Sequence, residues 1–139
     1  MPDTHTGSCL CGAVTYKTTG PMREVVFCHC SQCRKQTGLY YASTNVSDEH
    51  IVIAGGENIS WYHSSPKGRR GFCKHCGSAL FWKYEGVGEI SIQAGSLDQP
   101  TDLTPGYHIF CADKGDFYEI NDGLPQFAKS SPGLVTNTE

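Results

Sequence analysis

The cysteines of this 139-residue chain are clustered in a way that suits metal binding. Seven of the eight lie in groups whose members are separated by only one or two residues, and the eighth, Cys111, stands alone. Thiolates this close in the chain can share one ion, and zinc in proteins takes four such ligands in a tetrahedron. The spacing therefore favours metal binding over a scattered set of disulfides. The groups are Cys9 with Cys11, then Cys28, Cys30 and Cys33, and then Cys73 with Cys76.

The first residues of the chain also argue against disulfides. Residues 1–8 contain neither a basic start nor an apolar run, so no secretory signal peptide is visible. We therefore expect a cytoplasmic protein, in which thiols stay reduced. Structural disulfides and a redox-active Cys-x-x-Cys pair are the weaker alternatives.

One cysteine pair has the sequence of a zinc knuckle. Cys73 and Cys76 have two residues between them, and Gly77, which permits a positive φ angle, follows them. A knuckle needs a second pair to close its tetrahedron. Cys9 and Cys11 can supply it, because residues i and i+2 of a strand point to the same face.

We predict that these four cysteines form a closed, structural zinc site. The site would join segments more than sixty residues apart in the chain, and such metal binding stabilises a small fold. The alternatives are two separate half-sites or reduced, buried cysteines.

The other cluster, which we call the trio, consists of Cys28, Cys30 and Cys33 and places three thiols within six residues. Three ligands leave the fourth position of a tetrahedron unfilled, which is typical of catalytic rather than structural zinc. Three thiolates also make the metal a weak Lewis acid, so the site suits holding another thiol as thiolate better than producing hydroxide from water. Alternatively, a distant ligand such as Cys111 or a histidine closes a second structural site.

Basic and histidine residues flank both clusters. Arg34 follows the trio, and a cation there can lower thiol pKa values or contact a substrate anion. A solvated surface charge is the simpler interpretation of Arg34. His29 and His75 lie inside the cysteine groups, and each could replace a cysteine as a ligand. We expect instead that they orient a ligand or lie at the surface.

The remaining sequence predicts a mainly β protein with little helix. Short runs of β-branched and aromatic residues are separated by Gly, Pro, Asn and Asp, which is typical of a small antiparallel β fold. A short helix is expected at 31–37, because Gly38 is a stop signal. We expect a single domain over residues 1–139, with its core at about 7–127 and a flexible tail at 128–139. Strands are expected at 13–18, 23–28, 40–46, 51–54, 59–62, 79–84, 89–94, 107–111 and 117–120.

Composition excludes several classes of protein. A net charge of −3 without a basic run argues against nucleic-acid binding, which relies on neutralising phosphates. No apolar run approaches the roughly 18 residues of a membrane-spanning helix. A hydrophobic content of 38% allows only a small core, so a cross-link is expected to help hold it.

With these motifs the sequence resembles the glutathione-dependent formaldehyde-activating enzyme (Gfa) family, also called the centromere-protein-V family. The resemblance runs in order over about residues 7–127 and includes all seven clustered cysteines. The matching segments are 7–14, 28–34 with Gly38, 72–80, 95–98 with Pro100, His108, and 120–127.

The resemblance implies a β-tent fold, in which antiparallel sheets are stapled by zinc, and two zinc ions per chain. It implies structural ligands at Cys9, Cys11, Cys73 and Cys76, and catalytic ligands at Cys28, Cys30 and Cys33. It also implies lyase-type carbon–sulfur chemistry, in which glutathione adds to formaldehyde to give S-hydroxymethylglutathione. The expected partners are therefore a small glutathione-like thiol and a small aldehyde.

Two other functions stay open. The first is a non-catalytic, zinc-stabilised binding module. Its binding surface would be formed by aromatic residues, although their spacing fits packing in the core of strands better than a binding surface. The second is a methionine sulfoxide reductase of type B, which would need Cys111 as its nucleophile, although its apolar neighbours favour a buried core residue. The aromatic residues are Trp61, Tyr62, Phe81, Trp82 and Tyr84.

Overall fold

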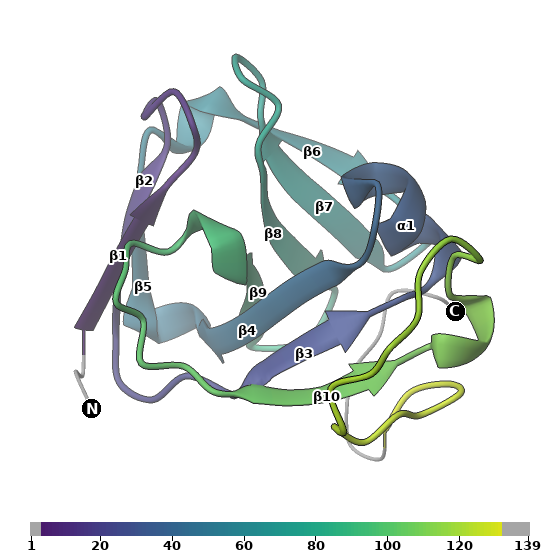
Figure 1. Cartoon of the computed structure of the whole chain (residues 1–139). Coiled ribbons are helices and arrows are strands. Elements are labelled where there is room, and N and C mark those ends of the chain that lie inside the picture. The colour runs from purple at the N-terminus through teal and green to yellow at the C-terminus, as the bar shows by residue number, and fades with distance from the viewer. Residues whose placement is uncertain (1–3, 132–139) are drawn as a thin grey trace.

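The computed structural model describes residues 4–131, which fold into two open β-sheets (Figure 1). The smaller sheet has the order β1-β2-β5 and consists of β1 (Thr4–Ser8), β2 (Thr15–Thr19) and β5 (Ile51–Ala54). β1 and β2 form a hairpin that starts with the pairing of Thr4 with Thr19 and ends with Ser8 opposite Thr15. The turn of this hairpin contains the first cysteine pair.

The larger sheet has the order β10-β3-β4-β9-β8-β7-β6. Its neighbouring strands are antiparallel except for β3 and β10, which are parallel. This pair corrects the expectation of purely antiparallel sheets: a parallel pair requires a long crossover, and here strands β4 to β9 lie between its members in the chain. The strands are β3 (Val25–Cys28), β4 (Tyr41–Ser47), β6 (Ile59–His63), β7 (Gly68–Cys73), β8 (Ala79–Tyr84), β9 (Glu89–Gln93) and β10 (Pro105–Ile109).

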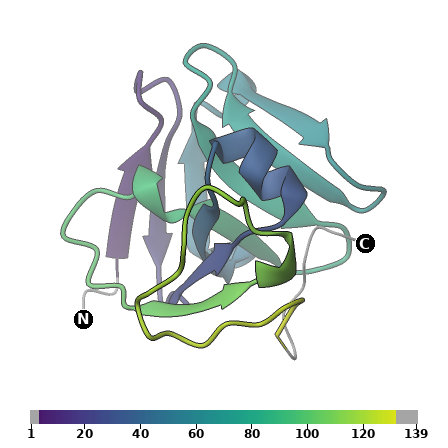
Figure 2. The ribbon, with the colours of Figure 1, turned by 45° about the vertical axis from the view of Figure 1, so that its right-hand side comes forward.

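Helix α1 (Ser31–Thr37) lies in front of the larger sheet in Figure 2 and has the bounds predicted from the sequence. Cys30 is its N-cap, and the Cys30 thiol accepts a hydrogen bond from the backbone N–H of Cys33. Gly38 ends the helix at φ 87°, a left-handed conformation that glycine adopts at low cost. The helix start therefore brings two of the three clustered cysteines together. Single 3-10 turns occur at Asp48–His50, Gly56–Asn58, Ala94–Ser96 and Cys111–Asp113.

Two strands were not predicted, and one predicted strand is wrong. β1 and β7 lack an alternating apolar pattern, because their buried positions include histidine, glycine and arginine rather than aliphatic residues. Residues 117–120 form no strand and lie in the loop after β10. The overall prediction of a mainly β fold with little helix is confirmed.

Each cysteine group is part of its own apolar cluster. Cys9 and Cys73 are buried with Val14, Leu80 and Ile92 where the two sheets pack together. A second cluster, built around β3, α1 and β10, contains the trio with four larger side chains. These side chains are Val26, Tyr41, Ile109 and Phe110. All three thiols of the trio and those of Cys9 and Cys73 are therefore held by packed surroundings, whereas Cys11 is exposed.

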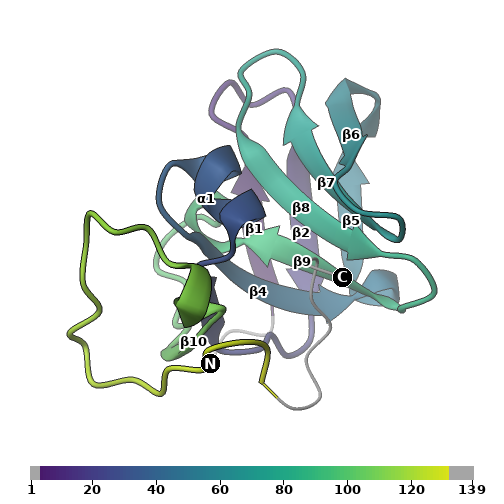
Figure 3. The same ribbon diagram turned by 90° about the vertical axis from the view of Figure 1, so that its right-hand side faces the viewer.

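The loop after β10 returns to the fold and docks on it. Figure 3 shows this loop, green to yellow, outside the sheets. Backbone N–H groups of Phe110 and Ala112 donate to the carbonyls of Lys129 and Ala128, and the Ser131 side chain is buried. The flexible tail expected at 128–139 stays a prediction, because residues 132–139 lie outside the described residues. No helix within residues 4–131 is long and apolar enough to cross a membrane.

Candidate metal centres

The structure brings the four cysteines of the predicted structural site together. The sulfur atoms of Cys9, Cys11, Cys73 and Cys76 lie within 4.8 Å of one another. The Cys11 sulfur is 3.7 Å from that of Cys9 and 3.7 Å from that of Cys73. Cys9 and Cys11 lie in the β1–β2 turn rather than on a strand, so the turn, not strand alternation, aims both sulfurs inward.

Backbone N–H groups donate hydrogen bonds to two of these sulfurs. The backbone N–H of Val14 donates to Cys9 at 3.3 Å, and that of His75 donates to Cys73 at 3.4 Å. A hydrogen bond with the Ser78 hydroxyl lowers the pKa of Cys76 to about 5, which favours the thiolate form that binds metal. His75 does not belong to the group: its ring is exposed and its Nε2 pairs with Asn58 Oδ1 at 2.9 Å.

The three cysteines of the second cluster also converge. Cys28 ends β3, Cys30 caps α1 and Cys33 lies in the first turn of that helix, and their sulfurs lie within 4.8 Å of one another. All three side chains are buried. Hydrogen bonds from the thiols of Cys28 and Cys33 hold the pKa of Cys30 far below its ordinary value. Within residues 4–131 neither Cys111 nor a histidine joins this group, and none of the eight cysteines forms a disulfide.

The arginine that touches the trio is Arg70 of β7. It is only 4% exposed, and its Nη2 donates to Cys33 Sγ at 3.4 Å and to Gln32 Oε1 at 3.3 Å. Its Nη1 donates to Gln36 Oε1 at 2.6 Å. No ion pair between Arg70 and a carboxylate occurs in the described part of the chain.

The surroundings of Arg70 therefore indicate the charge of the three-cysteine group. Burying an unpaired guanidinium is costly, so a nearby negative charge must compensate it. Within residues 4–131, the acidic group that is hydrogen-bonded to Arg70 is the Cys33 thiol, and the centroid of the Tyr41 ring lies 5.8 Å from the guanidinium carbon. The arrangement fits a group of thiolates that holds a cation.

The arginine predicted from the sequence to contact a substrate anion is Arg34. Arg34 is half-buried. Burial raises the pKa of Tyr118, and the positive charge of Arg34 partly offsets this rise. A contact of Arg34 with a substrate anion stays a prediction. Arg70 was missed because β7 was not predicted, and its spacing from the knuckle does not point to the trio that it contacts.

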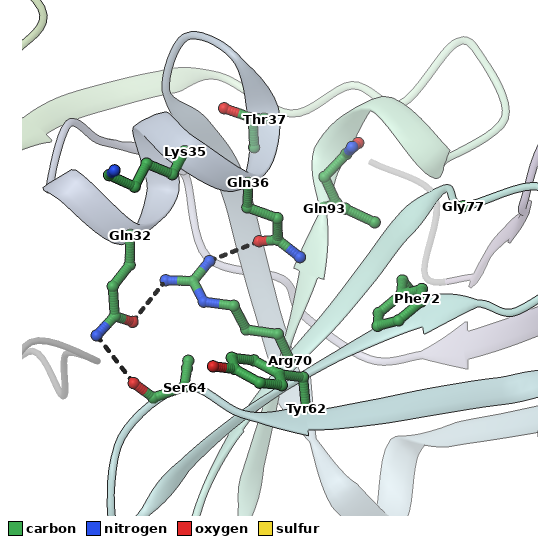
Figure 4. Close-up of a pocket in the computed structure, with 11 residues that line it drawn as sticks. Gln32, Lys35, Gln36, Thr37, Tyr62, Ser64, Arg70, Phe72, Gly77 and Gln93 are labelled. Carbon is green, nitrogen blue, oxygen red and sulfur yellow. Dashed lines mark hydrogen bonds between the residues drawn. The ribbon is translucent and has the colours of Figure 1, made fainter.

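A cavity of about 770 Å³ adjoins Arg70 between α1 and strands β6 to β8. Figure 4 shows Arg70 reaching from β7 towards α1, with hydrogen bonds to Gln32 and Gln36. Phe72 and Tyr62 line the sheet side of the cavity, and Lys35 contributes a cation from the helix. The volume and the mixture of aromatic, amide and cationic groups suit a small polar ligand.

His29 lies between Cys28 and Cys30 in the chain. This side chain is fully buried, so the alternative of a surface position is wrong. Its Nε2 lies 2.8 Å from His108 Nδ1, and its Nδ1 is hydrogen-bonded to the Tyr118 hydroxyl. His108 Nε2 in turn lies 2.8 Å from Asp122 Oδ2. Burial lowers the pKa of His29 to about 4, so its ring is neutral near pH 7.

Comparison with known proteins identifies the family. A sequence model of the glutathione-dependent formaldehyde-activating enzyme family matches residues 4–113. The chain belongs to this family. A protein of Halomonas elongata, whose provisional name is glutathione-dependent formaldehyde-activating enzyme, is 32% identical over 126 residues, which cover 82% of this chain and 79% of the relative.

Two further comparisons agree with this family. An uncharacterized lyase of Schizosaccharomyces pombe is 28% identical over 128 residues, which cover 91% of this chain and 92% of the relative. A crystal structure of a Rhodobacter sphaeroides protein, 19% identical, superposes with a TM-score of 0.56 over 88% of this chain and 98% of the other, which shows the fold alone. The prediction of a Gfa-like lyase is confirmed at this level, whereas the centromere-protein-V resemblance stays a prediction.

Proposed function

We propose that the chain is a zinc-dependent carbon–sulfur lyase that joins a thiol such as glutathione to formaldehyde or another small carbonyl. The observation that carries the proposal is the convergence of three buried thiols beside Arg70, which also borders a cavity. The names of the related proteins support the same reaction class. The family match covers residues 4–113, which include both cysteine groups.

Two zinc ions per chain fit the donors. Soft thiolate ligands select zinc over harder cations, and a set of four closed thiolates is typical of structural zinc. We assign the structural ion to the four sulfurs of the first group. The second ion would be held by the trio, and with it bound the remaining position would keep a substrate thiol in its thiolate form at neutral pH.

The side chains around the cavity would bind and orient the thiol. Lys35 provides a positive charge for a substrate carboxylate, Phe72 and Tyr62 cover apolar parts, and Arg70 balances the charge of the trio. In the reaction the sulfur forms a bond to the carbonyl carbon and the π electron pair of the carbonyl moves to oxygen. That oxygen takes up a proton, and the thiol proton leaves to solvent.

The binding-module alternative has less support from the structure. Of the five aromatic residues considered for such a surface, Phe81 is buried and Trp61 stacks on it. Tyr62, at 65% exposure, lies at the cavity rather than on a broad apolar face. A cytoplasmic location and the lack of nucleic-acid partners stay predictions from the sequence.

The test is adduct formation by the zinc-loaded protein. With glutathione and carbon-13-labelled formaldehyde, NMR exchange measurements should show interconversion faster than the uncatalysed reaction. Cys30→Ser should abolish the acceleration, retain one zinc per chain and still unfold cooperatively. Wild-type exchange at the background rate, or one zinc per chain in fully reduced protein, would overturn the proposal.

A further inference from the structure

A continuous chain of hydrogen bonds lies behind the segment that carries Cys28 and Cys30. It runs from Tyr118 through His29 and His108 to Asp122. His29 sits between the two cysteines in the sequence, and both of its ring nitrogens are engaged. Its backbone N–H also donates to the carbonyl of Ile109 on β10 at 3.0 Å. Ring and backbone of this one residue are therefore both anchored.

The hydrogen bonds of this chain have one direction when both imidazoles are neutral. The ionised Asp122 carboxylate can only accept, so His108 donates from Nε2 and accepts at Nδ1. His29 must then donate from Nε2 to His108 and accept at Nδ1 from the Tyr118 hydroxyl. Every group in the chain is satisfied, and the ring of His29 has a single allowed orientation.

The end of the chain is itself fixed by the loop after β10. Asp122 accepts from the backbone N–H of Leu124 at 3.0 Å, so the carboxylate is held in place although it is exposed. The backbone N–H of Phe127 donates to the carbonyl of His108, and that of His108 donates to the carbonyl of Pro125. Tyr118 and Asp122 lie C-terminal to residues 4–113, over which the family model matches.

We propose that His108 and Asp122 are positioning residues of the three-cysteine site, which act through His29 to hold Cys28 and Cys30 where they bind the metal ion. The proposal rests on the metal assignment made under the proposed function. Loss of the carboxylate or of the second imidazole leaves a buried nitrogen unpaired and frees the His29 ring. Because peptide bonds join His29 to both cysteine residues, a backbone shift that follows release of its ring displaces Cys28 and Cys30.

The four-cysteine site provides a matched control. His75 also lies between two cysteines, and its Nε2 pairs with Asn58 Oδ1 at 2.9 Å, but this contact is exposed. Asn58→Ala removes a histidine partner at the other site, as Asp122→Ala does at the trio, and it also removes the hydrogen bond from Asn58 Nδ2 to the carbonyl of Ala13. Water can replace the lost partner of the exposed His75, whereas His108 is buried.

The test uses the full chain loaded with cadmium-113 for NMR and with zinc for release to a chelator. The resonance of the three-cysteine site is identified by its loss in Cys30→Ser. Asp122→Ala and His108→Leu should shift or broaden this resonance alone and speed release of one of the two zinc ions about tenfold. His108→Asn, whose amide oxygen can accept from His29 Nε2, should restore slow release. Asn58→Ala should leave the resonance of the trio unchanged.

Two outcomes would overturn the proposal. Unchanged spectra and release rates in both Asp122→Ala and His108→Leu would show that the hydrogen-bond chain does not control the trio. Equal disturbance of both resonances would show a general structural role instead. The readout needs no catalytic activity, so a wild-type protein with two ions and no adduct formation would overturn only the proposed function.

Discussion

The Nη2 atom of Arg70 donates a hydrogen bond to the sulfur of Cys33 at 3.4 Å. Arg70 lies on β7 and Cys33 in α1, so the contact joins the larger sheet to the helix that carries two of the clustered thiols. Arg70 also lines the cavity. The three-cysteine group and the cavity therefore share one cation.

Replacing Arg70 should weaken metal binding at the trio. A hydrogen bond to a charged group contributes about 1.5–3 kcal/mol, so Arg70→Met should lower zinc affinity at this site about 10- to 100-fold. Arg70→Lys should show a smaller loss, because it keeps the charge without the planar fork. Competition with a chromophoric chelator measures both affinities.

The neighbouring Arg69 is the control for this change. Its side chain is exposed and lies over the Trp61 ring, 4.7 Å from the centroid, away from the trio. Arg69→Met should leave zinc affinity unchanged. Equal effects of the two substitutions would mean that Arg70 acts only through net charge.

Opening the four-cysteine site should destabilise the whole fold. This site joins the β1–β2 turn to the end of β7, and the apolar cluster around Cys9 and Cys73 depends on that connection. Cys76→Ser should cost at least ~3 kcal/mol of unfolding free energy, because binding of a structural ion is coupled to folding. Denaturant titration with and without added zinc measures the loss. Cys111→Ser, outside both groups, should change stability by only about 1 kcal/mol, and a comparable loss in both variants would contradict the assignment.

Lys35 should control affinity for anionic thiols. Lys35→Glu should raise KM for glutathione about threefold or more and leave kcat unchanged, since an exposed charge interaction contributes about 0.2–1 kcal/mol and is here reversed. A neutral thiol such as 2-mercaptoethanol should show no change in KM. Lys17→Glu makes the same change of charge on the exposed face of the smaller sheet. If Lys17→Glu raised KM for glutathione as much as Lys35→Glu, the proposal that the thiol binds at the cavity would be wrong.

The stability of the fold should fall in alkali through Tyr16. Burial raises the pKa of this phenol to about 12, from an ordinary value of 10. The unfolded chain therefore loses its proton first, so the contribution is complete below pH 10 and is lost as the pH rises towards 12. The loss should reach about 3 kcal/mol for this residue, because each unit of the pKa difference corresponds to about 1.4 kcal/mol.

Tyr16→Phe isolates this contribution. Ser96 Oγ donates to the carbonyl of Gln93, so the Tyr16 hydroxyl donates to Ser96 Oγ, at 2.6 Å, and its removal should cost only about 1 kcal/mol at neutral pH. Urea unfolding at pH 8, 10 and 11 should show a shallower alkaline decline for the variant. Parallel declines in the two proteins would show that other groups, such as the buried Tyr41, whose pKa burial also raises, cause the loss.

Features with short-range causes were predictable from the sequence. The bounds of α1 follow from a capping side chain and a glycine at its end, and the two cysteine groups follow from spacing within the chain. The pairing of residues 9 and 11 with 73 and 76 was also predictable, because a knuckle needs a second pair of thiols. Only the local reason was wrong, since a turn and not a strand directs Cys9 and Cys11.

The tertiary structure alone decided what surrounds the trio. Arg70 reaches Cys33 from a strand without an apolar pattern, and His29 meets His108 because β3 and β10 pair in parallel across most of the chain. Asp122 joins them from a loop that docks by backbone hydrogen bonds. Thiol ligands can be recognised from their spacing in the sequence, because one ion must bind them all. The charges and hydrogen bonds that orient the ligands come from distant segments, and only the folded chain places them.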